Sequence, residues 1–137
     1  MDRLTELHLF RGTVTNRILI VEDEEDILEL LFAIFDDLGD YRILCARDGE
    51  EALRIAREDN PDVILLDILL PKMNGCDVCK SVKSDPATSH AKVLMISGVV
   101  QNSNQQKAQE VGADAFIAKP FDSIVLVEKV EELLRNT

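Results

Sequence analysis

The residues best suited to chemistry in this sequence are polar side chains that directly follow runs of aliphatic residues. Glu22 and Asp23 come at the end of the first run, and Asp67, Ser97 and Lys119 stand at the ends of three later ones. If these runs are neighbouring strands of one sheet, three carboxylates, a hydroxyl and an ammonium group lie in one small region.

Three neighbouring carboxylates repel one another unless a cation neutralises them, and Mg²⁺ is a hard cation that prefers oxygen ligands. A carboxylate held beside Mg²⁺ can attack phosphorus as a nucleophile. Lys119 would share the charge of the transferred phosphoryl oxygens, and Ser97 could donate a hydrogen bond to one of them. Each residue taken alone has an ordinary role as a helix cap, a loop residue or a turn. Their joint occurrence at successive strand ends indicates phosphoryl transfer.

The elements that must position these residues alternate regularly along the chain. Helical spacing of apolar residues separates short aliphatic runs, and this alternation predicts a parallel sheet covered on both faces. The expected fold is α/β, a flavodoxin-like doubly wound five-stranded sheet in the order 2-1-3-4-5 with five helices, whose sites form where the strands end. The predicted strands are residues 17–22, 41–46, 62–67, 92–97 and 114–118.

Residues typical of helix ends agree with this alternation. Asp48 precedes Gly49-Glu50-Glu51, a capping arrangement that predicts the start of a helix. Asn60-Pro61 predicts the end of that helix, and Gly112 predicts a helix end before the last strand.

Composition narrows the classes of function. The chain has 137 residues, the size of one ordinary domain, and a formal net charge of −11, which argues against direct nucleic-acid binding. Aromatic residues make up only 4% of the chain, which argues against a stacking surface for bases or flavins. No apolar run approaches the roughly 20 residues of a membrane helix, and Met1 to Phe10 lacks the apolar stretch of a secretory signal. We therefore expect a cytoplasmic protein without a membrane segment.

The three cysteines, Cys45, Cys76 and Cys79, also suit a reducing cytoplasm. Cys76 and Cys79 form a C-x-x-C motif, which allows a redox or zinc reading. Zinc needs four ligands, however, and the chain offers no second cysteine or histidine pair. We favour the interpretation that they are two small apolar residues on a helix, one of them buried.

Four segments together resemble the receiver domain of bacterial two-component response regulators. The resemblance covers the chain from about Arg17 to its end, which implies a receiver domain at residues 17–137 and an N-terminal extension at residues 1–16. The segments are ILIVED at 18–23, VILLDILLPKMNG at 63–75, VLMISG at 93–98 and GADAFIAKPF at 112–121.

This resemblance implies that Asp67 is the phosphoacceptor. It would receive the phosphoryl group from a sensor histidine kinase or a histidine phosphotransferase. It also implies a Mg²⁺ ion on the Asp67 carboxylate, with Asp23 in direct contact, Glu22 contacting it through water, and the backbone carbonyl of Leu69 as a further ligand. The protein would then switch conformation and signal to a downstream protein.

The same resemblance implies roles for residues further along the chain. Ser97 matches the switch hydroxyl and Phe116 the switch aromatic, while Lys119 matches the phosphate-contacting lysine and precedes an expected cis peptide at Pro120. Such a protein is not an enzyme acting on external substrates, because it catalyses only its own phosphorylation and dephosphorylation.

Three other classes of protein share parts of this pattern. A phosphatase of the haloacid dehalogenase type needs a general acid two residues after its nucleophile, where this chain has Leu69. A flavin carrier needs a hydroxyl- and glycine-rich phosphate loop after the first strand, where this chain has Glu-Asp-Glu-Glu-Asp. The third alternative is a structural module whose acidic pocket is inert, which Mg²⁺-dependent labelling would separate from a receiver.

Two predictions concern kinetics and motion. In receivers the residues two after the phosphoacceptor and two after the switch hydroxyl flank the path of the attacking water. They are Leu69 and Val99 here, so we expect slow self-dephosphorylation. The fourth helix should fall within residues 101–112, where only Ala108 and Val111 are apolar. So thin an apolar stripe predicts a weakly held segment that moves on activation.

A last prediction concerns a contact surface. Leu4, Leu7 and Phe10 recur at a spacing of three, as on one face of a short helix, and Ile124 and Val125 begin the last helix on its polar side. Two contacts could bury the latter pair: the chain's own N-terminal segment, or another chain, such as the second copy in a homodimer formed through the face of the last helix. The alternative is a disordered tail beside two unpartnered aliphatic residues.

Overall fold

The computed structural model describes residues 15–98 and 102–136, and for residues 102–105 it describes the backbone alone. Ten elements alternate along the chain, and the five strands form one parallel sheet in the order β2-β1-β3-β4-β5. This arrangement confirms the predicted fold. The elements are β1 (Asn16–Val21), α2 (Glu25–Leu38), β2 (Tyr41–Ala46), α3 (Gly49–Asp59), β3 (Val63–Asp67), α4 (Gly75–Ser84), β4 (Lys92–Ser97), α5 (Asn102–Glu110), β5 (Ala115–Ala118) and α6 (Ser123–Arg135).

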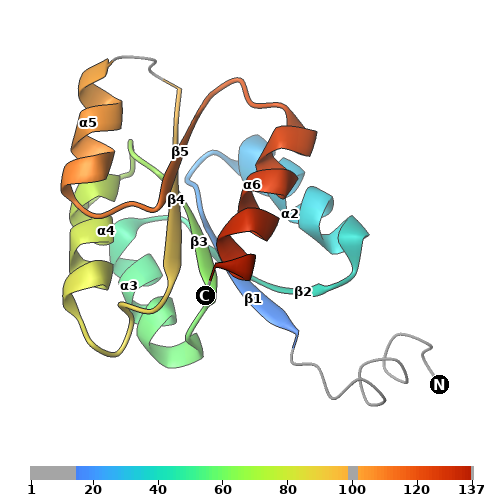
Figure 1. Ribbon diagram of the computed structural model, residues 1–137, viewed down its shortest axis with the longest axis horizontal. Coiled ribbons are helices and arrows are strands. Elements are labelled where there is room, and N and C mark those ends of the chain that lie inside the picture. Colours follow the sequence, from blue (N-terminus) through green and yellow to red (C-terminus); the bar gives the residue numbers. More distant parts are fainter. Residues whose placement is uncertain (1–14, 99–101, 137) are drawn as a thin grey trace.

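The helices form a layer on each face of the sheet (Figure 1). Helices α2 and α6 cover one face, and α3, α4 and α5 cover the other. Alternate residues of β1 supply the two cores: Ile18 and Ile20 pack on the α2–α6 side, while Leu19 and Val21 pack on the α3–α4–α5 side. This alternation follows from the two-residue period of a strand, and it explains why a strand between two helical layers is apolar throughout.

The helix ends predicted from sequence are present. The Asp48 side chain accepts a hydrogen bond from the Glu51 amide at 2.9 Å and so caps α3. Asn60 ends α3 in a left-handed conformation with φ of 48°. Gly112 follows α5 with φ of 88°, a conformation that glycine adopts without strain.

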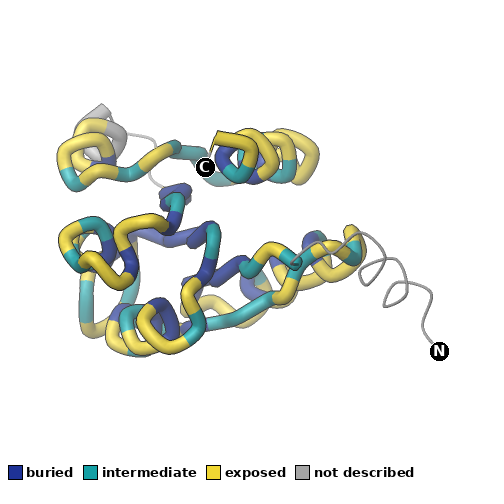
Figure 2. Tube along the Cα trace, turned by 60° about the horizontal axis from the view of Figure 1, so that its bottom comes forward, coloured by how far each residue is buried: buried dark blue, intermediate teal, exposed yellow. Residues whose placement is uncertain are grey.

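Burial is highest in the middle of the sheet and lower at its edges (Figure 2). Every residue of β3 is buried, whereas every residue of the edge strand β5 is only partly buried. Among the described part of the chain, no helix is long and apolar enough to cross a membrane.

Candidate functional site

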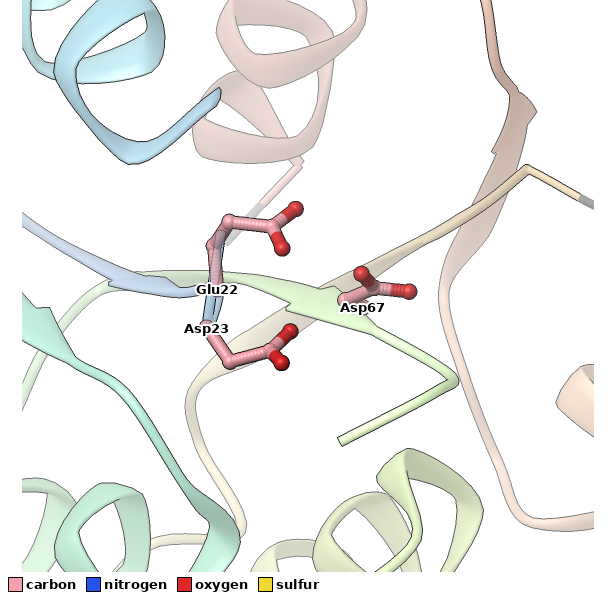
Figure 3. A group of neighbouring side chains, drawn as sticks. All are labelled: Glu22, Asp23 and Asp67. Carbon is pink, nitrogen blue, oxygen red and sulfur yellow. The ribbon is translucent and has the colours of Figure 1, made fainter. Parts of the chain in front are cut away.

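Three acidic side chains meet at the carboxyl edge of the sheet (Figure 3). Glu22 and Asp23 follow β1, and Asp67 is the last residue of β3. Each offers a carboxylate oxygen, and these oxygens lie within 4.8 Å of one another. Parallel pairing of β1 with β3 places the two strand ends side by side, so the proximity expected from sequence is realised.

Lys119 brings a positive charge into this group. Its Nζ donates to Glu22 Oε1 at 2.9 Å and to Asp67 Oδ2 at 3.1 Å. The Lys119 backbone amide donates to the Ser97 carbonyl at 2.7 Å, and the Lys119–Pro120 peptide is cis, as expected. The fully buried Ser97 ends β4 at the same edge, so the structure brings together all five of the sequence-predicted polar residues.

Burial and pairing act against each other in this pocket. Burial raises the pKa of the Glu22 carboxyl, although hydrogen bonds from Lys119 and from the Glu24 amide oppose the rise. Burial alone would lower the pKa of Lys119, but its hydrogen bonds to Glu22 and Asp67 outweigh that effect and raise it. Lys119 therefore keeps its proton at neutral pH and stays a permanent cation beside the acidic group.

The backbone around Asp67 is held by close packing. The Leu69 amide donates to Asp67 Oδ1 at 3.1 Å, and the Gly75 amide donates to the Ile68 carbonyl at 2.8 Å. A Cβ added at Gly75 would lie 2.8 Å from the Ile68 Cα and closer still to the Asp67 carbonyl oxygen. Only glycine fits this close approach. Sequence reasoning assigned Gly75 no role, although an Asn-Gly pair shortly after a strand signals a tight backbone turn.

The remaining predicted residues lie around this centre. Leu69 has a largely exposed side chain, with 59% of its surface accessible. Phe116 lies in β5, pairs in register with Met95 of β4, and packs against the core on the α3–α4–α5 side. Val99, the other residue expected to influence the phosphoryl lifetime, lies outside the described residues.

The donor set of this pocket fits a hard divalent cation. When ionised, three carboxylates and one ammonium group leave two negative charges in a largely buried site. All the acidic ligand atoms are oxygens, which suits Mg²⁺ and not a soft metal. Among the described residues, no second cluster of three acidic, histidine or cysteine side chains has such spacing.

Comparison with known proteins identifies the class that this fold and site define. A model of the response regulator receiver domain family matches residues 18–131. Response regulator PleD of Caulobacter vibrioides is 39% identical over 119 residues, which are 87% of this chain and 26% of PleD. The chain therefore belongs to the receiver domain family of two-component response regulators, in which phosphorylation on aspartate and Mg²⁺ binding are typical.

Solved structures agree with this assignment. A response regulator receiver domain protein from Methanospirillum hungatei has a TM-score of 0.84 at 30% identity, covering 90% of this chain and 96% of that one. The receiver domain of sensor histidine kinase PA1611 from Pseudomonas aeruginosa has the same fold, with a TM-score of 0.81 at 23% identity over 88% of this chain and 98% of its own. That domain was solved with a magnesium ion in its active-site cleft.

The chain spans between about a quarter and a half of the length of the curated relatives it matches, 26% of PleD and 50% of the regulator PhoP of Bacillus subtilis.

Proposed function

We propose that Asp67 accepts a phosphoryl group and that the protein changes shape in response. The observation that carries this proposal is the contact of the Lys119 ammonium with both Glu22 and Asp67, with Asp23 alongside. An acidic pocket that served only as a structural salt bridge would not need the exposed third carboxylate, Asp23. The arrangement supplies a nucleophile, a fixed cation and a set of metal ligands.

The transfer step needs few groups from the protein. A carboxylate oxygen of Asp67 attacks the phosphorus of a phosphohistidine, the bond from phosphorus to the imidazole nitrogen breaks, and its electron pair leaves with the imidazole. The product is an acyl phosphate on Asp67. Lys119 lies 3.1 Å from Asp67 Oδ2, so its ammonium group is close enough to contact an oxygen of the arriving phosphoryl group.

The pocket would also hold Mg²⁺, with Asp23, Asp67 and the Leu69 carbonyl as direct ligands and Glu22 contacting the ion through water. The bound ion supplies charge neutralisation for the phosphoryl oxygens. Two observations support this: the two uncompensated negative charges of the pocket, and the magnesium ion in the PA1611 receiver. Glu22 and Asp23 would bind and orient the Mg²⁺ ion, and Lys119 would balance part of the remaining negative charge of the pocket.

Ser97 and Phe116 would relay the change to the surface. Ser97 is buried at the end of β4, and Phe116 lies half-buried on the neighbouring β5. A movement of the Ser97 hydroxyl towards the phosphoryl group would free space beside β5 and let Phe116 turn inward. The surface formed by α5 and β5 would then change for a downstream protein.

The activity is confined to the protein's own aspartate. A phosphatase for external esters needs a general acid two residues after the nucleophile, and Leu69 there has no proton to donate. The partners that fit this function are a sensor histidine kinase or a histidine phosphotransferase as donor, and a downstream protein as target.

Labelling with a small phosphodonor tests the proposal directly. Incubation with acetyl phosphate and Mg²⁺ should add one phosphoryl group per chain, measured by intact mass. Asp67→Asn should abolish the addition, while Asp77→Asn, a matched change at an exposed acid on α4, should leave it intact. Undiminished labelling of Asp67→Asn, or full labelling in EDTA, would contradict the mechanism.

A further inference from the structure

An apolar groove runs between α2 and α6, on the outer side of those helices. Its aliphatic lining comes from Ile34 and Leu38 of α2 and from Ile124 and Val127 of α6. Leu38 is 44% exposed and Ile124 is 69% exposed, which is unusual for large aliphatic side chains that face one another. The exposure of Ile124 was predicted from sequence, and the structure confirms it.

The groove continues to the point where the described chain begins. A second hollow lies at the C-terminal ends of the same two helices. Its lining includes Asn16, Tyr41 and Leu134. The two hollows share Leu38 and Glu131, so they form one continuous surface. Asn16 is the first residue of β1, and the chain that precedes it therefore enters at one end of the groove.

The preceding segment is long enough to occupy this surface. Fourteen residues stand before Thr15. The six steps from Phe10 to Asn16 span about 20 Å when extended. The part of α6 from Ile124 to Leu134 is about 15 Å long at the rise of an α-helix. Leu4, Leu7 and Phe10 can therefore reach aliphatic groups along the whole groove.

The border of the groove is mainly acidic, with Arg135 as a basic residue in the second hollow. Acidic side chains border the groove at Asp37, Glu128 and Glu131, and none of the ion pairs between described residues involves them. Burial raises the pKa of the Tyr41 hydroxyl in the second hollow, and the nearby acids Glu131 and Asp40 raise it further.

The preceding segment carries the acids Asp2 and Glu6, and it carries Arg3 and Arg11, one on each side of Leu4, Leu7 and Phe10. These arginines match the acidic border in sign and bracket the residues that would enter the groove.

We propose that residues 1–14 dock in the groove between α2 and α6, with Leu4, Leu7 and Phe10 against its aliphatic lining and the arginines against its acidic border. A tethered segment has an effective concentration of about millimolar, so a modest contact area is enough. A second copy would need a much larger area to bind stably. The proposal does not depend on the phosphorylation of Asp67.

A double-mutant cycle in the full chain tests this docking. Phe10→Ser removes one apolar side chain from the segment, and Ile124→Ser removes one from the groove. Phe32→Ser is the matched control, because Phe32 is an exposed apolar residue of α2 at 42% that does not line the groove. The measured quantity is hydrogen-exchange protection of amides in the last turn of α2 and the first turns of α6.

If the segment docks, Phe10→Ser lowers protection in those turns about tenfold, as expected for loss of one buried aromatic side chain. The loss of protection caused by Phe10→Ser should be much smaller when Ile124→Ser is already present. In the Phe32→Ser background it should be as large as in the wild-type chain. Equal losses in all backgrounds, or no loss, would overturn the proposal. So would a loss of protection that depends on protein concentration, because that result would assign the groove to a second copy.

Discussion

The two halves of the sheet's carboxyl edge differ in how tightly they are packed. On one side, all five residues of β3 are buried and α4 buries Gly75, Val78, Cys79 and Val82. On the other side, β5 has no buried residue, and Ala108 is the one buried residue among the side chains described for α5. Asp67 comes from the tightly packed half, and Lys119 follows the loosely packed one.

If Asp67 is phosphorylated as proposed, this difference in burial offers a route from the site to the surface. The tight half holds Asp67 at a defined position, while the loose half carries Lys119 and buries fewer residues, so we expect the loose half to move at lower energetic cost. The contacts of Lys119 with Glu22 and Asp67 join the halves directly. Phosphorylation of Asp67 would alter those contacts, and the half with fewer buried residues would move.

The largest expected effect on stability comes from disturbing the packing of the tightly packed half at Gly75. Gly75→Ala would push a methyl group into the backbone of Asp67 and Ile68, which cannot move aside as a flexible side chain could. We expect a loss of about 3 kcal/mol or more in the free energy of unfolding.

Gly98→Ala is the matched control, because a Cβ there would come no closer than 3.7 Å to Lys119 atoms. It should cost less than about 0.5 kcal/mol. Urea denaturation measures both changes. Equal losses for the two variants would show that the supposed difference in packing does not exist.

A pH-dependent effect should come from Cys79, which lies where the two halves meet. Its thiol contacts the Val111 carbonyl after α5 at 3.6 Å, and burial raises its pKa to about 11. The unfolded thiol titrates at its ordinary value of 9.0, so this contribution to stability is complete below that pH.

The contribution is lost as the pH rises towards 11, because the unfolded state releases the proton first. The expected loss is about 2–3 kcal/mol. Cys79→Ala should remove most of this slope between pH 9 and 11, and Cys76→Ala should keep the larger part of it. A slope unchanged by Cys79→Ala would mean that the thiol is not held in the protonated form.

A smaller effect should follow from separating the halves at Lys83. Its Nζ donates to the Ala91 carbonyl at 2.8 Å and to Asp114 Oδ2 at 2.7 Å, which ties α4 to β4 and to the start of β5. Lys83→Met keeps the aliphatic part but removes both bonds. We expect a loss of about 1–2 kcal/mol by urea denaturation.

Lys80→Met, a change at an exposed lysine on the same helix, should be close to neutral. A cost for Lys80→Met as large as that for Lys83→Met would argue against Lys83 as a specific link between α4 and β5.

The smallest effect on stability should come from α5 itself. Gln106→Ala replaces an exposed residue and should change the free energy of unfolding by less than about 0.5 kcal/mol. In native-state hydrogen exchange, the amides of α5 should nevertheless be the least protected of the five helices, about tenfold or more below those of α4. Beryllofluoride, as a phosphoryl mimic, should change protection in α5 most. No change there would place the moving element elsewhere.

Much of the fold was determined by short stretches of sequence. The alternation of aliphatic runs with helical spacing predicted five strands and five helices, and two strand ranges were predicted without error, at Tyr41–Ala46 and Lys92–Ser97. Two others began one residue later than predicted, and the first strand lies one residue earlier than predicted at both ends. Such features depend on residues within one or two turns of each other, so periodicity and capping chemistry reveal them.

The candidate site was predictable as a set of residues but not as a set of contacts. The positions of Glu22, Asp23, Asp67, Ser97 and Lys119 at strand ends indicated one pocket, because parallel strands end at one edge. Only the tertiary structure shows that a single ammonium group contacts Glu22 and Asp67 together, since Glu22 and Lys119 are 97 positions apart. Their distance depends on the twist of the sheet and the packing of every intervening element.

Three further features were decided by tertiary structure alone. The need for glycine at position 75 arises from the close approach of its backbone to Asp67 and Ile68. The looseness of β5 arises from its place at the edge of the sheet. The groove between α2 and α6 arises because each helix turns its stripe of buried residues to the sheet and leaves aliphatic neighbours such as Leu38 and Ile124 facing outward. The helical period placed Ile124 on the polar side of its helix, but only packing determines that Leu38 stays exposed and that the two residues line one groove.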